Sequence, residues 1–221
     1  MHQESKSAAP RRTRRTAKIV LAAFALAAAL TVSASAQAIA PDAPVTYDNR
    51  YELYGGLNLM TFQAGPQLPK RMNNGGFEAL GTYWLNDRVG LGLDLRGEYG
   101  TSPVLPNFYG LNRVLVYQHM ALVGAQVRGP KNHFAAINYH GYVGVSKGTF
   151  DGGTGNIQPQ NVGLYTNRTK PVGAFGGSVD FNYSKRIAIR FSPDLMITHF
   201  DSPYREFFAI SGGVVYRIGK R

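Results

Sequence analysis

The feature that most constrains this chain is a strict alternation of apolar and polar residues, clearest between Val89 and Tyr99. Aliphatic side chains occupy every second position and charged ones share the positions between: Val89, Leu91, Leu93 and Leu95 against Asp94, Arg96 and Glu98. Successive side chains of a β-strand point to opposite faces, so this segment has one apolar and one charged face. A helix would scatter the charges around its surface, and glycines would destabilise it. The alternation therefore predicts a strand.

Similar segments recur along the chain and predict eight strands: 51–62, 75–85, 89–99, 114–127, 134–150, 172–183, 187–200 and 206–218. Most are about as long as the roughly 9 to 11 residues that a tilted membrane strand needs. An ordinary globular strand has only about five or six residues. The strand lengths therefore favour a protein that spans a bilayer.

The predicted connections alternate between short and long. The short ones are 86–88, 128–133 and 184–186, and the long ones, rich in Gly, Pro and Asn, are 63–74, 100–113 and 151–171. Bacterial outer-membrane barrels have short turns in the periplasm and long loops outside the cell. We therefore predict an all-β fold, an eight-stranded antiparallel up-and-down transmembrane β-barrel over residues 51–221, with both of its ends on the periplasmic side.

The N-terminus has the three parts of a secretory signal peptide, predicted over residues 1–38. A basic region through Lys18 precedes an apolar stretch from Ile19 to about Val32, and cleavage is expected between Ala36 and Ala38. The apolar stretch is short for a spanning helix, which needs about 20 residues, so cleavage is preferred to anchoring. Residues 39–50, with Pro41 and Pro44, predict an extended leader.

The positive charge of the chain does not indicate nucleic-acid binding. The formal net charge is +11, but six basic residues precede the apolar stretch: Lys6, Arg11, Arg12, Arg14, Arg15 and Lys18. The remaining excess is spread over loops and strand ends, so no nucleic-acid partner is expected. The chain has no cysteine, which excludes disulfides and thiolate metal sites.

The charged residues of the strands predict a polar network inside the barrel. They all have the parity opposite to the aliphatic residues: Glu78, Asp94, Arg96, Glu98, Asp180, Arg190, Asp194 and Arg217. Acids and arginines nearly balance, as a narrow interior requires, because a buried charge needs a partner. Alternation alone leaves open a soluble lipocalin-like periplasmic binder, whose apolar face would point inward.

Aromatic residues near the strand ends favour the membrane alternative. They are Tyr51, Tyr54, Phe62, Phe77, Tyr83, Trp84, Tyr99, Phe134, Phe150, Phe181, Tyr183, Phe200, Phe207, Phe208 and Tyr216. Rings of aromatic side chains at both membrane interfaces are typical of such barrels. These residues are therefore predicted to form the interfacial girdles.

Three segments resemble the eight-stranded OmpA/OmpX-type outer-membrane barrel domain family: 51–56 (YELYGG), 84–91 (WLNDRVGL) and 211–218 (SGGVVYRI). The resemblance covers about residues 47–221 and implies location in the outer membrane. It also implies insertion by the barrel assembly machinery, which recognises a last strand with alternating apolar residues and a terminal aromatic. Phe208, Ile210, Val214 and Tyr216 keep that alternation, although the chain ends on Arg221 instead of phenylalanine.

The expected role is structural or in surface interaction, with outer-membrane lipid and lipopolysaccharide as partners. The interior of eight strands is about filled by side chains, so function would lie in the loops. The candidate loop contacts are Asn156, Gln158, Gln160, Asn161, Tyr165, Asn167, Arg168 and Lys170. No cofactor, metal or catalytic residue is predicted. Two alternatives stay open: a narrow channel for small or hydrophobic molecules, and a lipid A hydrolase using His199 with Ser202.

Overall fold

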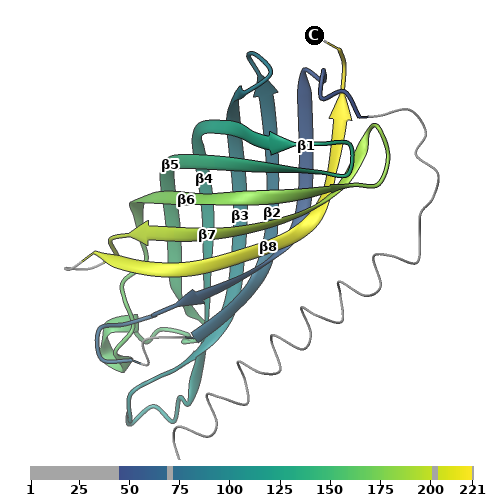
Figure 1. Cartoon of the computed structure of the whole chain (residues 1–221). Coiled ribbons are helices and arrows are strands. Elements are labelled where there is room, and N and C mark those ends of the chain that lie inside the picture. The colour runs from purple at the N-terminus through teal and green to yellow at the C-terminus, as the bar shows by residue number, and fades with distance from the viewer. Residues whose placement is uncertain (1–44, 69–71, 201–203, 221) are drawn as a thin grey trace, which may run out of the picture. The chain divides into compact units, whose positions relative to one another are not determined.

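The computed structural model describes residues 45–68, 72–200 and 204–220, and the predicted signal peptide lies outside these residues. Eight antiparallel strands, each paired with its sequence neighbours, form a closed barrel in which β8 also pairs with β1 (Figure 1). The strands are β1 (Tyr51–Phe62), β2 (Met72–Trp84), β3 (Val89–Pro103), β4 (Arg113–Lys131), β5 (Ala135–Gly152), β6 (Arg168–Asn182), β7 (Ile187–Thr198) and β8 (Arg205–Ile218). The predicted fold class is confirmed.

Several strands continue past their predicted ends. β3 extends to Pro103, β5 to Gly152, and β6 begins at Arg168 instead of Val172. These extensions carry polar or small residues, so the alternation of apolar residues, from which the boundaries were predicted, stops before the strands do. Backbone pairing continues without it, as between Pro103 and Arg113. The long connections are correspondingly shorter than predicted.

The strands are strongly tilted. Starting at Tyr51 on β1 and moving from each residue to its partner on the next strand, the path once around the barrel ends at Phe208 on β8. Phe208 does not return to Tyr51. Its backbone N–H donates to Oγ1 of Thr61, at the other end of β1. Such an offset on closure requires the strands to tilt relative to the barrel axis. In Figure 1, β7 and β8 accordingly cross the direction of β1 to β3 at a steep angle.

We call the two ends of the barrel the turn end and the loop end. Short connections lie at the turn end, and a polar side chain closes each of them on the backbone. Asn86 Oδ1 accepts from the N–H of Val89, Asn132 Oδ1 from that of Ala135, and Ser184 Oγ from that of Ile187. Asn and Ser favour turns for this reason. The ends of β1 and β8 that pair at Tyr51 also lie here.

The long connections at the loop end fold onto one another. Their described parts are 63–68, 104–112 and 153–167, the last containing a short 3₁₀ helix, η1 (Pro159–Val162). The N–H of Leu105 donates to the carbonyl of Val162 (3.1 Å), and that of Tyr165 to the carbonyl of Ala64 (2.8 Å). Backbone hydrogen bonds therefore join all three connections into one layer.

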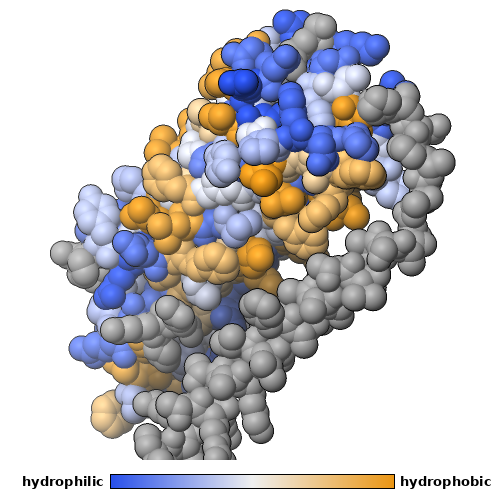
Figure 2. Space-filling model, viewed as in Figure 1, coloured by the Kyte–Doolittle hydropathy of each residue, from blue (hydrophilic) through white to orange (hydrophobic). Residues whose placement is uncertain are grey.

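The outer face of the barrel is apolar. Outward-facing leucines include Leu53, Leu57 and Leu59 on β1, of which Leu57 is 76% exposed. In Figure 2 hydrophobic residues cover the middle of the barrel, and hydrophilic ones gather toward the turn end. The soluble lipocalin-like alternative requires the opposite arrangement and is therefore wrong. Among the described residues, no helix is long and apolar enough to cross a bilayer.

Candidate functional site

A cluster of five charged side chains fills the lumen near the turn end, and we call it the turn-end cluster. Nη2 of Arg128 lies 2.6 Å from Oε1 of Glu52. Arg190 binds Asp180 through two nitrogens, at 2.6 and 2.8 Å, and reaches Oε2 of Glu52 at 3.2 Å. Arg217 lies within 3.5 to 3.7 Å of both acids. Two-point arginine–carboxylate contacts fix geometry as well as charge, so this end of the lumen is rigidly specified.

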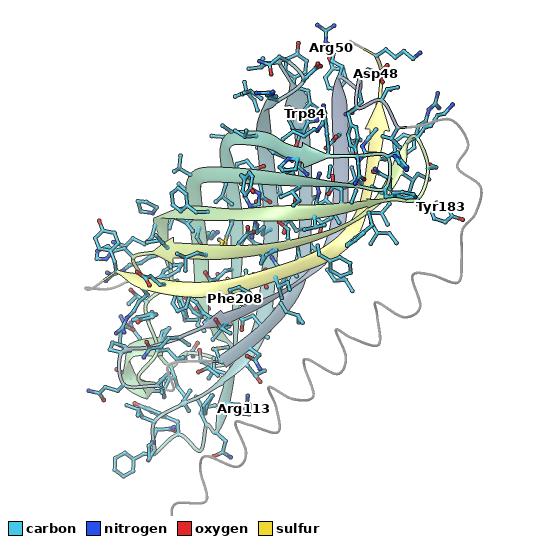
Figure 3. The ribbon with its side chains drawn as sticks, in the orientation of Figure 1. Asp48, Arg50, Trp84, Arg113, Tyr183 and Phe208 are labelled. Carbon is cyan, nitrogen blue, oxygen red and sulfur yellow. The ribbon has the colours of Figure 1, made fainter. Side chains whose placement is uncertain are left out.

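Two aromatic rings close the turn end around this cluster. The guanidinium of Arg128 lies 3.7 Å from the ring centroid of Trp84. In Figure 3, Trp84 lies at the same end of the barrel as Arg50, and Arg113 lies at the other end. Tyr47, from the leader, is buried between Arg128 and Arg217, at 5.2 and 4.9 Å from its ring. Cations over aromatic faces attract, so the leader is held in the mouth of the barrel.

The hydrogen bonds and backbone angle of Tyr47 are not those expected of a simple extended leader. The hydroxyl donates to the carbonyl of Asn132 and accepts from Nδ2 of Asn182, both at 2.6 Å. Its φ of 56° lies in the left-handed region, which is rare outside glycine. Burial raises the pKa of Tyr47, so the hydroxyl stays protonated and able to donate. The predicted leader residues 39–44 lie outside the described part of the chain.

A second group of charges, the central cluster, lies farther along the lumen around Arg96. Nη2 of Arg96 lies 2.7 Å from Asp94, 2.6 Å from Asp194 and 3.6 Å from Glu78. Nε2 of His140 lies 2.6 Å from the other oxygen of Asp194. The central cluster therefore sets three carboxylates around one arginine, whereas the turn-end cluster has three arginines and two carboxylates.

A layer of uncharged amides and one acid follows the central cluster, and we call it the polar layer. It comprises Asn58, Asn74, Glu98 and Gln118, all fully or almost fully buried. Both carboxylate oxygens of Glu98 lack a hydrogen-bond partner among the described residues, as do both side-chain polar atoms of Asn58 and of Asn74. The structure thus brings seven of the eight predicted network residues into ion pairs and leaves Glu98 outside them.

Aromatic side chains close the loop end of the lumen and form what we call the aromatic lid: Phe62, Phe150, Tyr165, Phe200 and Phe207. The ring centroids of Phe62 and Phe207 are 4.8 Å apart, and those of Phe150 and Phe200 are 5.5 Å apart. Offset or edge-to-face contacts at these distances are favourable. The lid joins residues of four strands or strand ends to the long connections.

The burial of aromatic side chains, in the lid and elsewhere in the lumen, corrects part of the girdle prediction. Six of the aromatics assigned to the membrane interfaces are buried instead: Tyr54, Phe62, Trp84, Phe150, Phe200 and Phe207. Tyr51, Phe134, Phe181, Tyr183 and Tyr216 do face outward near the turn end. Position near a strand end was used for the prediction, but the parity within the strand decides the face.

The predicted loop contacts lie in different environments. Asn156, Gln158, Gln160 and Asn161 are exposed in the connection 153–167, and Asn167 bonds to Asp151 (2.7 Å). Two placements differ from the prediction. Tyr165 is buried in the aromatic lid, because its backbone is bonded to Ala64. Arg168 and Lys170 belong to β6, because strand pairing continues past the predicted boundary.

A hollow of about 350 Å³ opens at the loop end between the connections. Its floor includes Leu105, Leu164 and Phe200, and polar atoms come from Gln160 and Arg168. Arg168 is exposed and places a guanidinium at the edge of an apolar surface. Such a surface can bind a group that is anionic at one end.

Two members of the turn-end cluster were missed in the sequence. Glu52 lies between Tyr51 and Leu53, which both face outward. Arg128 continues the inward parity of Gln126 but was assigned to a turn, because Gly129 and Pro130 follow it. The alternation itself was the signal that could have identified both residues.

The structure describes only part of the site that the lipid A hydrolase alternative requires. His199 packs against Tyr204, with ring centroids 4.8 Å apart. Its supposed partner Ser202 lies outside the described residues, as does Asp201. Within the described ranges, no three histidine, aspartate or glutamate side chains are grouped so that they could hold a metal ion.

Comparisons with known proteins identify the fold. No protein-family model and no curated protein sequence matches the chain. Among solved structures, it is similar to Ail, the attachment invasion locus protein of Yersinia pestis, in complex with the heparin analogue sucrose octasulfate. That match has 14% identity and a TM-score of 0.51, and it covers 77% of this chain and 99% of Ail.

The outer membrane protein OprG from Pseudomonas aeruginosa matches with 10% identity and a TM-score of 0.56, covering 77% of this chain and 96% of OprG. The apolar outer face and charged lumen of this chain are those of a barrel that spans a membrane. The chain therefore has the fold of the eight-stranded OmpA/OmpX-type outer-membrane barrels.

Proposed function

We propose that this protein has a structural and surface-interaction role in the outer membrane, with the turn end in the periplasm and the loop end outside the cell. The observation that carries the proposal is the filled lumen, where the turn-end cluster, the central cluster and the aromatic lid follow one another. Eight strands enclose only about enough space for side chains. Neither an open pore nor an enzyme is part of the proposal.

Surface interaction would use the hollow at the loop end. Its apolar floor and the guanidinium of Arg168 suit an anionic ligand with apolar or sugar-ring surface. The sulfated ligand named with Ail supports the choice of anionic probes. Lipopolysaccharide phosphates offer the same chemistry next to the barrel. Insertion by the barrel assembly machinery, through the outward apolar residues of β8, is part of the same proposal.

A narrow channel is the second candidate, and the polar layer favours it. Unpartnered amide and carboxylate atoms of Asn74 and Glu98 could be solvated by water in the loop-end half of the lumen. Current recordings in planar bilayers separate the two candidates. The structural role predicts no discrete currents at high protein load, whereas a channel predicts steps that change in Arg96→Gln.

Binding of sucrose octasulfate and of lipopolysaccharide to the folded barrel tests the surface role. Replacing Arg168 with Gln is expected to weaken binding about tenfold, the order of one charged hydrogen bond. Arg113→Gln is the matched control, because Arg113 also lies at the loop end but bonds to Thr101 and does not line the hollow. Equal affinities of wild type, Arg168→Gln and Arg113→Gln would reject the hollow as the site.

A further inference from the structure

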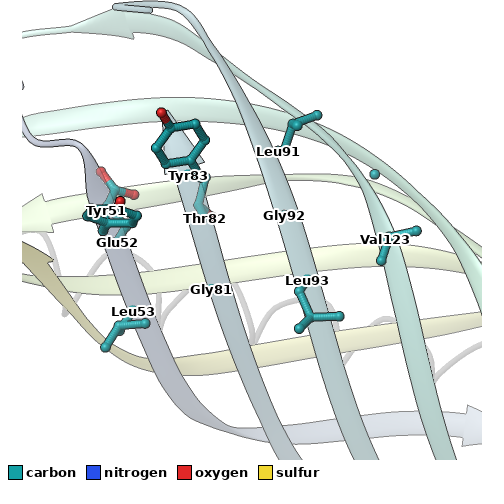
Figure 4. Close-up of a pocket in the computed structure, with 11 residues that line it drawn as sticks. Tyr51, Glu52, Leu53, Gly81, Thr82, Tyr83, Leu91, Gly92, Leu93 and Val123 are labelled. Atoms are coloured by element: carbon teal, nitrogen blue, oxygen red, sulfur yellow. The ribbon is translucent and has the colours of Figure 1, made fainter. Parts of the chain in front are cut away.

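A groove of about 580 Å³ runs over the outer face of β1 to β4, beginning near the turn end (Figure 4). Leu53, Leu91, Leu93 and Val123 contribute aliphatic walls, and Tyr83 lies toward the turn end of the groove. The groove faces the surface that the fold presents to lipid, so its occupant must be apolar over most of its length.

A missing side chain creates the groove. Leu53, Gly81, Leu93 and Val123 form one row of paired residues across the four strands. Figure 4 shows Leu53 and Leu93 on either side of Gly81. An ideal Cβ on Gly81 would have only Leu53 Cδ2 nearby, at 3.9 Å, so the space above this glycine is open. A narrow apolar groove of this kind fits an acyl chain.

The turn end of the groove has the opposite character. The rings of Tyr51 and Tyr83 are 5.3 Å apart, and the guanidinium of Arg50 lies 5.7 Å from the Tyr83 ring centroid. Exposed Arg88 comes from the turn that joins β2 to β3, the two strands that carry the floor and one wall of the groove. Two acids lie at the same end, Asp87 in this turn and Asp48, two residues before Arg50. With Lys185, Arg186 and Lys220, the basic groups at this end outnumber the acids.

We propose that the groove is a binding site for an anionic phospholipid of the leaflet at the turn end. One acyl chain lies over Gly81 between Leu53 and Leu93, and the phosphate meets Arg50 and Arg88. Tyrosines are favoured at the level between chains and headgroups, where Tyr51 and Tyr83 lie. The inference goes beyond the proposed surface role and depends only on the membrane fold.

The charge around the groove explains the choice of an anionic lipid over a zwitterionic one. Further exposed basic residues lie at the same end of the barrel: Lys185, Arg186 and Lys220. Each basic residue near a membrane surface contributes about 1 kcal/mol of attraction to anionic lipid, which corresponds to about a fivefold change in affinity. Phosphatidylethanolamine carries the same phosphate but adds an ammonium, which the arginines do not favour.

Photocrosslinking in nanodiscs tests the proposal with the folded protein. The probe is phosphatidylglycerol with a photoreactive acyl chain, diluted into phosphatidylcholine, and crosslinked peptides are located by mass spectrometry. Crosslinks are expected to concentrate around Leu53, Gly81 and Leu93. Gly81→Leu, which fills the groove, should remove that concentration.

Gly75→Leu is the matched control. Gly75 faces outward on the same strand, and its ideal Cβ would meet only Leu59 Cδ2, at 3.8 Å. This variant should keep the wild-type crosslinking pattern. Crosslinks spread evenly around the barrel in the wild type, or unchanged in Gly81→Leu, would overturn the site.

The headgroup preference is tested by a variant that leaves the strands untouched. Arg50→Gln with Arg88→Gln should reduce the crosslinking of phosphatidylglycerol relative to a matched phosphatidylethanolamine probe by about fivefold or more. Acyl crosslinks over Gly81 should persist in this variant. Equal crosslinking of the two probes in the wild type would reject the anionic selectivity even if Gly81→Leu fails to fold.

Discussion

The two halves of the lumen are filled by different means. Toward the turn end, guanidinium and carboxylate groups pair at 2.6 to 3.7 Å. Toward the loop end, the aromatic lid packs without ion pairs, and its rings come from strands and connections alike. Paired buried charges demand specific partners, whereas apolar packing tolerates changes of shape. The comparison therefore predicts that the turn-end half is sensitive to chemistry and the loop-end half to volume.

The largest effect is expected for Arg96→Met. It removes the guanidinium that contacts Asp94, Asp194 and Glu78 and leaves these acids buried together. Breaking a buried pair by removing one partner costs about 3–5 kcal/mol. Urea unfolding in lipid vesicles, followed by gel mobility and by fluorescence of Trp84, the chain's one tryptophan, measures the loss. A loss below about 1 kcal/mol would mean that the central cluster contributes no specific pairing.

Arg190→Lys keeps the positive charge and tests whether the geometry of the arginine–carboxylate contacts matters at the turn end. Lysine cannot reproduce the two-point contact with Asp180 while also reaching Glu52. A loss of about 2 kcal/mol is expected, the order of a hydrogen bond to a charged group. The same unfolding measurement applies. Wild-type stability in Arg190→Lys would show that net charge alone holds this end together.

Phe150→Leu is the corresponding conservative change at the loop end. Phe150 contacts Phe62, Tyr165 and Phe200, and leucine keeps the site apolar at somewhat smaller volume. The expected loss is below about 1.5 kcal/mol, smaller than that of Arg190→Lys. If Phe150→Leu proved the more destabilising of the two, the contrast between the halves would be reversed.

The sequence predicted the strand framework and the parity of the charges better than the way the ends are closed. Alternation identified Asp94 and Arg96 as inward residues, because a strand leaves only two faces to choose from. The positions of Tyr165 and Tyr47 depend on how the segments outside the strands fold back over the barrel. The periodicity of the sequence does not indicate the path of such segments. The seal at each end was therefore not predictable, although the inward parity of Phe62 and Phe150 could have been.

Tyr47→Phe is the smallest change, and it separates the ring from its hydroxyl at the turn-end mouth. The phenyl ring still packs against Arg128 and Arg217, while the bonds to Asn132 and Asn182 are lost. Because Nδ2 of Asn182 keeps its bond to the carbonyl of His133 (3.1 Å), a loss of about 1 kcal/mol is expected near neutral pH, the usual contribution of one hydrogen bond.

The pH dependence of that loss tests whether the buried hydroxyl acts as a donor. Burial raises the pKa of Tyr47 above the ordinary tyrosine value of about 10. Its contribution is therefore complete below that value and declines as the pH rises through the folded-state pKa. The stability difference between wild type and Tyr47→Phe should shrink in alkaline solution, and the subtraction removes the effect of the other tyrosines. A difference that stays constant with pH would show that the leader is held by the ring and its cation contacts, as the aromatic lid is held by packing at the other end.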